Sequence, residues 1–109
     1  MAIKILVLYG HGTDVIAKTF RSHFRDAAIE FFDYHSEDWK ESWEVEVMKL
    51  DGVIINTASN ALKAGHILKG YNSMRSQNGK KDLPYIFTDY YYSVEEEYRL
   101  FIESLLTSA

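Results

Sequence analysis

Residues 3–9 read Ile-Lys-Ile-Leu-Val-Leu-Tyr, and Gly10, His11 and Gly12 follow them directly. An almost unbroken apolar run of this length is typical of a strand that is buried on both faces of a parallel sheet. The two glycines allow a sharp turn out of the strand, and the polar residues after them favour the start of a helix near Asp14. The chain is therefore predicted to open with a strand, a tight turn and a helix.

The strand pattern returns in residues 28–34, 52–57 and 83–88, and helical patterns separate the four runs. These helical patterns repeat every three or four positions: Ile16, Phe20 and Phe24; Trp39, Trp43 and Val47; Leu62, Gly65 and Leu68, with Ile67, Tyr71 and Met74 beside them; and Val94, Tyr98, Phe101, Ile102, Leu105 and Leu106. Regular alternation of strands and helices requires right-handed crossovers and a parallel sheet covered on both faces. We therefore predict an α/β protein, a three-layer αβα sandwich with a four-stranded parallel sheet of order 2-1-3-4. Pro84 at the start of the fourth run agrees with a strand at the sheet edge.

Length and composition restrict the class of protein further. The chain has 109 residues, of which 47% are hydrophobic and 26% are charged, as expected for one globular domain over residues 1–109. It contains no cysteine, which excludes thiol catalysis, iron–sulfur clusters and cysteine-bound zinc. No targeting signal or membrane span is recognised, so a cytoplasmic protein without a membrane partner is expected. The net charge of -4 argues against nucleic acid as the main partner.

The charges are unevenly distributed along the chain. Residues 26–51 hold nine acidic side chains against two lysines, whereas residues 63–81 hold five basic side chains and no acidic one. One interpretation is a pair of solvated helix faces of opposite sign. The other is a polarised surface that binds a charged protein partner.

In an open parallel sheet, ligands bind beyond the carboxyl ends of the strands, where the strand order reverses. The predicted order places this point between the first and third strands. Loops at residues 10–14, 58–60 and 89–93 are then expected to converge there. The candidate binding residues are Gly10, His11, Gly12, Thr13, Thr57, Ser59, Asn60, Asp89, Tyr90 and Tyr92.

The first and last of these loops each allow more than one role. The amide groups after Gly12 suit an anion, but Asp14 would compete for the same donors. His11 is either a phosphoryl acceptor or general base, or a hydrogen-bonded turn residue. The tyrosines at positions 90–92 either stack on a planar ligand, anchor a protein interface or cover the end of the core. The chain has no metal-ligand spacing and no recognised hydrolase motif, so no enzymatic reaction is predicted.

Several segments together resemble the flavodoxin family and the FMN domains of diflavin reductases. The first strand with Gly12 and Thr13 resembles the family's strand and phosphate loop, and residues 31–34 and 51–57 resemble its second and third strands. Residues 85–89 with Tyr92 resemble its fourth strand and flavin loop. The first loop is shorter than the family pattern, and four strand–helix units are recognised where the family has five.

This resemblance implies FMN, or a related phosphorylated planar ligand, and an electron-transfer role. Gly12 and Thr13 would then contact the phosphate, Ser59 and Asn60 would flank the ring, and Asp89 with Tyr92 would close the site. Two alternatives remain. The first is a ligand-free adaptor of the same fold, acting through its charged faces or through a homodimer formed at the edge of the fourth strand. The second is a phosphocarrier that uses His11, because the fold also resembles the IIB-like domains of sugar phosphotransferases.

Overall fold

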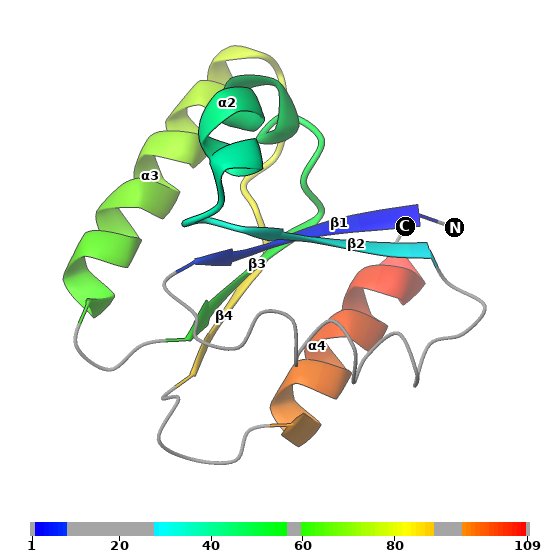
Figure 1. The fold of residues 1–109 in the computed structure, drawn as a ribbon. Coiled ribbons are helices and arrows are strands. Elements are labelled where there is room, and N and C mark those ends of the chain that lie inside the picture. The colour runs from blue at the N-terminus through cyan, green and yellow to red at the C-terminus, as the bar shows by residue number, and fades with distance from the viewer. Residues whose placement is uncertain (1, 9–27, 57–59, 89–94, 109) are drawn as a thin grey trace.

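The computed structural model describes residues 2–8, 28–56, 60–88 and 95–108. Its strands are β1 (Ala2–Leu8), β2 (Ala28–Asp33), β3 (Gly52–Asn56) and β4 (Tyr85–Thr88), and its helices are α2 (Glu37–Glu46), α3 (Ala61–Gln77) and α4 (Glu95–Ser108). All neighbouring strands pair in parallel, in the order β2-β1-β3-β4 (Figure 1). The predicted α/β class and the predicted strand order 2-1-3-4 are therefore confirmed. The helix predicted after the first loop lies outside the described residues.

Side chains of β1 alternate between two cores. Ile3, Ile5 and Val7 pack in one cluster with α4, whereas Leu6 and Leu8 pack in another with α2 and α3. All five of these side chains are buried. Successive residues of a strand point to opposite faces, so a strand covered on both sides needs apolar residues at every position. This requirement explains the unbroken apolar run.

The helices form two outer layers around the sheet. Figure 1 shows α2 and α3 on one face and α4 on the other. On the α2–α3 face the core includes Trp39, Val47, Leu68 and Tyr71, and on the α4 face it includes Tyr98, Ile102 and Leu105. This three-layer arrangement is consistent with a flavodoxin-like fold.

Gly52 at the start of β3 permits α4 to approach the sheet closely. A Cβ atom at this position would lie 2.7 Å from Cδ1 of Leu105 and 3.1 Å from Cζ of Phe101. The first distance is shorter than real Cβ contacts and the second is tighter than most. A larger residue at position 52 would force the side chains of Leu105 and Phe101 on α4 to shift.

Local signals in the sequence define the start of α2. Ser36 is the N-cap, and its Oγ accepts a hydrogen bond from the backbone N–H of Trp39 at 3.2 Å. Glu37 and Asp38 lie in the first turn, where carboxylates interact favourably with the helix dipole. Trp39, which follows them, is fully buried and packs against the sheet.

The apolar stripe predicted for the third helix is rotated in the structure. Leu62, placed on that stripe by its spacing, is 78% exposed, and Gly65 is also exposed. The buried positions of α3 are Ala64, Leu68, Tyr71 and Arg75. The sequence pattern was ambiguous here because Ile67 and Met74 give a second apolar stripe, and these two residues are half-buried at the contact with α2.

Candidate functional site

The strand order reverses between β1 and β3, as predicted for the binding site. Leu8 at the end of β1 pairs with Ile55 of β3, and Asn56 at the end of β3 pairs with Thr88 at the end of β4. The carboxyl ends of these three strands therefore lie side by side at one edge of the sheet (Figure 1). Any loops that follow these ends begin next to one another.

Asn60 is the one predicted site residue within the described part of the chain. It is exposed, it precedes α3 as the N-cap residue, and its carbonyl oxygen accepts the N–H of Ala64 at 2.9 Å. Asn60 therefore lies at the start of α3, and its predicted role in binding stays a prediction. The other nine predicted residues, Gly10, His11, Gly12, Thr13, Thr57, Ser59, Asp89, Tyr90 and Tyr92, lie outside the described residues.

A buried polar chain lies beneath this edge. Thr88 Oγ1 is 3.0 Å from the Tyr98 hydroxyl of α4 and 3.3 Å from Oδ1 of Asn56. A hydroxyl group has only one proton, so Tyr98 donates to Thr88, and the proton of Thr88 is directed to Asn56 Oδ1 and to the more distant Ile55 O at 3.5 Å. Burial raises the pKa of Tyr98, which keeps its hydroxyl protonated and able to donate.

The side chain of Asn56 is 6% exposed, and within the described ranges no acceptor is hydrogen-bonded to its Nδ2. Buried polar groups are normally paired with protein or with water, so Nδ2 is a candidate donor to a water or to a ligand at this edge. Sequence analysis included Thr57 and Ser59 but missed Asn56 and Thr88. The available signal was a polar residue at the end of each apolar run.

Comparisons of the chain with protein-family models, with curated proteins and with solved structures found no match. The likeness to flavodoxins therefore rests on sheet order, helix placement and the segments compared above.

Among the described residues, no three His, Asp or Glu side chains are grouped in a way that could hold a metal ion. None of the described helices is both long enough and apolar enough to cross a membrane.

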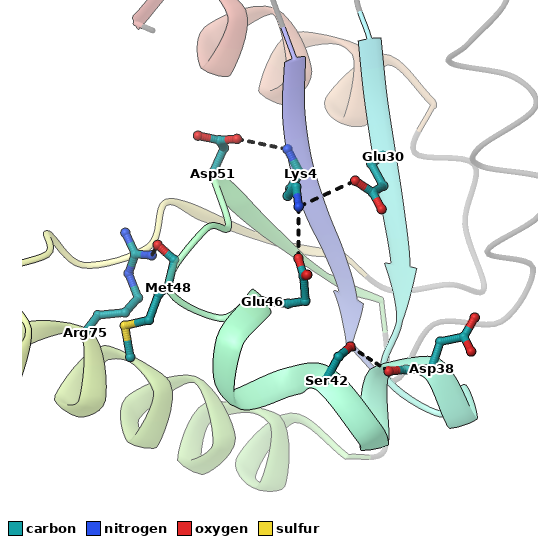
Figure 2. A network of polar contacts seen from close by, with 8 residues as sticks. All are labelled: Lys4, Glu30, Asp38, Ser42, Glu46, Met48, Asp51 and Arg75. Carbon is teal, nitrogen blue, oxygen red and sulfur yellow. Dashed lines mark hydrogen bonds and ion pairs between the residues drawn. The ribbon is translucent and has the colours of Figure 1, made fainter.

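The opposite end of the molecule carries a charged network (Figure 2). Nζ of Lys4 lies 2.9 Å from Oε2 of Glu46 and 3.7 Å from Oε2 of Glu30, and the backbone N–H of Lys4 donates to Asp51 at 2.9 Å. The hydrogen bond to Glu46 is the main cause of the raised pKa of Lys4. A lysine that is held protonated in this way is a poor nucleophile or base. The network links β1, β2 and the end of α2, and we interpret it as structural.

Arg75 joins α3 to the segment that follows α2. Its Nη1 donates to the carbonyl oxygens of Val47 at 2.9 Å, Met48 at 3.3 Å and Leu50 at 3.4 Å, and its Nε donates to Lys81 O at 2.9 Å. Burial lowers the pKa of the guanidinium, and the nearby Asp51 and Asp82 oppose that effect. An arginine side chain nevertheless stays charged in proteins, so Arg75 is a permanent donor at this junction.

Two hollows flank α3. The α2–α3 groove, of about 510 Å³, is lined by Tyr34, Trp39, Trp43, Ile67, Tyr71 and Met74, with Lys40, His66 and Gly70. The β4-side hollow, of about 450 Å³, is lined by Ile55, Ala61, Gly65, Leu68 and Asn72, with Lys69, Asp82, Tyr85 and Phe87. Sequence analysis identified neither, because each hollow is formed by residues from separate parts of the chain.

The uneven charge seen in the sequence is distributed over α2 and α3. Glu37, Asp38, Glu41 and Glu44 are exposed on α2. On α3 the exposed charged and titratable side chains are basic: Lys63, His66 and Lys69. Neighbouring helices on the same face of the sheet therefore carry opposite charge.

Proposed function

We propose that this domain binds FMN, or a related phosphorylated planar ligand, at the carboxyl ends of β1, β3 and β4, and that it acts in electron transfer. The observation that carries the proposal is the reversal of strand order between β1 and β3, which brings these strand ends to one edge. Open parallel sheets bind their ligands at this position. The resemblance of the neighbouring segments to flavodoxins supports FMN as the ligand.

The described residues at this edge fit a planar ligand that has polar atoms on its rim. Asn56 Nδ2 has no acceptor among the described residues, and Thr88, which also contacts the Tyr98 hydroxyl, orients the Asn56 side chain through Oδ1. Such a fixed donor is expected to hydrogen-bond an oxygen or nitrogen of the ring system. A bound flavin would supply the electron-transfer chemistry, and the protein would orient the ring and limit its contact with water.

Titration of FMN into the purified protein tests this proposal. We expect saturable quenching of FMN fluorescence at micromolar to tens-of-micromolar protein, a common affinity range for small ligands. A Thr88→Val variant keeps the shape of the side chain but removes the hydroxyl that orients Asn56. We expect it to weaken FMN binding about tenfold, the equivalent of one hydrogen bond.

Thr107→Val is the matched control, because Thr107 is exposed on α4 and bonds only to helix carbonyls, Glu103 O and Ser104 O, in the described structure. It should bind FMN like the parent chain. Circular dichroism would show that both variants are folded. Unquenched FMN fluorescence across the titration of the parent chain would refute the flavin proposal.

A second candidate function, an adaptor that forms a homodimer, is favoured by the edge strand β4. Tyr85 is 59% exposed and Phe87 is 46% exposed on this strand, next to the β4-side hollow. An edge strand with exposed aromatic residues is a suitable surface for pairing with a second copy. Sedimentation of the parent chain should give twice the mass of one chain, and Phe87→Lys should return it to a single chain. A parent chain that sediments as a monomer at every concentration would exclude this role.

A further inference from the structure

We propose that the α2–α3 groove is a second binding site, which takes a small planar aromatic acid of two or three rings. The groove lies between α2 and α3, on the face of the sheet opposite α4 (Figure 1). Its volume of about 510 Å³ is within the usual range for small-molecule sites. The proposal does not depend on FMN binding at the strand ends.

Aromatic side chains form the floor and one wall of the groove in a fixed arrangement. Trp39 and Tyr71 are buried with their ring centroids 6.1 Å apart and nearly perpendicular, and Trp39 Nε1 donates to the Tyr71 hydroxyl at 3.3 Å. Trp43 lies 5.7 Å from Tyr71 with an angle of 31° between the rings, and it remains half-buried. Fixed aromatic faces of this kind favour a flat aromatic ligand, since no side chain has to be ordered on binding.

Gly70 leaves the opposite wall of the groove open. It lies inside the 17-residue helix α3, and a Cβ atom built on it would have no neighbour within 4 Å. Glycine in a helix interior is unfavourable relative to alanine, and no packing contact in the described structure requires it here. A ligand that approaches the backbone of α3 would provide such a requirement.

The titratable side chains that line the groove are basic or phenolic. Lys40 and His66 lie on its rim, and no carboxylate belongs to the described lining. Glu37 is near, because it pairs with Lys40 at 3.5 Å, but it does not line the groove. A carboxylate could replace Glu37 as the partner of the Lys40 ammonium and accept from His66, whereas a cation would meet no carboxylate in the described lining. The charges therefore select an aromatic acid over an aromatic amine.

The indole N–H signals of the protein give a direct test. The chain has two tryptophans, and both line this groove. Their two Nε1–H signals in a ¹H–¹⁵N spectrum would report on a ligand there, and a Trp43→Phe variant would assign them. The probes are 2-naphthoate and its neutral analogue 2-naphthamide. We expect saturable shifts with naphthoate, with a Kd on the order of 1 mM or tighter for a ligand of this size.

Two leucine substitutions on α3 form a matched pair. Gly70→Leu should fill the groove and weaken naphthoate binding at least about tenfold, whereas Gly65→Leu, on the opposite side of the same helix, should leave it within about twofold. Both positions are open, so both variants should fold. Lys40→Gln should remove the preference for naphthoate over naphthamide. Thr88→Val should bind naphthoate normally, which separates this site from the strand ends.

Three kinds of result would overturn the proposal. The first is an absence of saturable shifts up to about 10 mM naphthoate, a concentration that detects even weak fragment binding. The second is equal binding of naphthoate and naphthamide, or equal weakening by the two leucine variants. The third is indole signals that shift with protein concentration alone, which would mean that a second copy of the chain covers the groove.

Discussion

The two sides of α3 show how the same helix forms two different surfaces. Toward α2, the residues of α3 pack against another helix. Aromatic side chains line the α2–α3 groove on this side, and one of them, Trp39, is only 1% exposed. Toward β4, they meet an edge strand, and Tyr85 and Phe87 in the β4-side hollow remain largely open to solvent. Both sides belong to the same regular helix. The element that packs against each side of α3, the helix α2 or the strand β4, determines whether the hollow there suits a small ligand or a protein partner.

The two sides are also held together differently. On the α2 side, Arg75 reaches across to three carbonyl oxygens beyond the end of α2, including that of Val47. On the β4 side, two side-chain hydrogen bonds connect α3 to the chain before the strand: Oδ1 of Asn72 accepts the N–H of Leu83 at 2.8 Å, and Nε of Arg75 donates to Lys81 O at 2.9 Å. We therefore expect substitutions on the α2 side to have the larger effects on stability.

Arg75→Met should give the largest loss of stability. Methionine keeps much of the apolar stem but removes every donor, which leaves buried carbonyls such as those of Val47 and Leu50 without this partner. Hydrogen bonds to a charged group and unsatisfied buried groups each account for 1–3 kcal/mol, so we expect a loss of about 3 kcal/mol. The midpoint of urea unfolding measures it.

Lys69→Met is the matched control for Arg75→Met. Lys69 is exposed and lies on the β4 side of the same helix, so its replacement should change stability by less than about 0.5 kcal/mol. Equal midpoints for the two variants would contradict the assignment of Arg75 as the link between α3 and the end of α2.

Trp39→Phe should cost about 2 kcal/mol, because it removes a buried indole ring and its hydrogen bond to Tyr71. Trp43→Phe, at the half-buried position on the same groove, should cost about half as much, in line with its smaller buried area. Urea unfolding followed by circular dichroism avoids the loss of fluorescence signal. If the half-buried substitution had the greater effect, the groove would not be built around Trp39.

Much of this fold can be predicted from local sequence patterns. The two hollows beside α3 cannot, for the most part. The run from Ile3 to Leu8 is apolar except at Lys4, which favours a strand covered on both faces, and the strand order agrees with the crossover rules. The α2–α3 groove instead depends on how far Trp43 lies from Tyr71, which is set by two helices packing together. Lys4 is a further example, because its ion pair with Glu46 joins residues 42 positions apart.

The same limit applied to the candidate site at the strand ends. The predicted strand order is confirmed, because topology fixes which strand ends are adjacent, and the binding site at those ends stays a prediction. The buried chain from Tyr98 to Thr88 to Asn56 was not predicted. Tyr98 fits the apolar stripe of the last helix, and nothing in the sequence shows that its hydroxyl meets the end of β4.

Tyr98→Phe tests how firmly β4 is held from the α4 side, and should cost about 1 kcal/mol at neutral pH for the lost hydrogen bond to Thr88. The pKa of Tyr98 is raised in the folded state, mainly by burial. Its contribution to stability is therefore complete below the unfolded pKa of about 10 and is lost as the pH rises through the folded pKa. Above about pH 10 the variant should lose less stability with pH than the parent chain does. Lys4, whose pKa is also raised, is present in both proteins, so the difference between their pH profiles isolates Tyr98.

The smallest and most discriminating effect is expected from two alanine substitutions, Gly65→Ala and Gly70→Ala. Both glycines lie inside α3 with open space where a Cβ would be, so each change should stabilise the protein by about 0.5–1 kcal/mol through helix propensity alone. Urea unfolding should show equal gains, because the propensity of a residue does not depend on which hollow it faces. Binding should differ: Gly70→Ala narrows the α2–α3 groove and should weaken naphthoate binding, whereas Gly65→Ala should not. If both variants gain stability but only Gly70→Ala loses naphthoate binding, Gly70 serves ligand access to the groove. If both variants bind naphthoate equally, Gly70 has no such role.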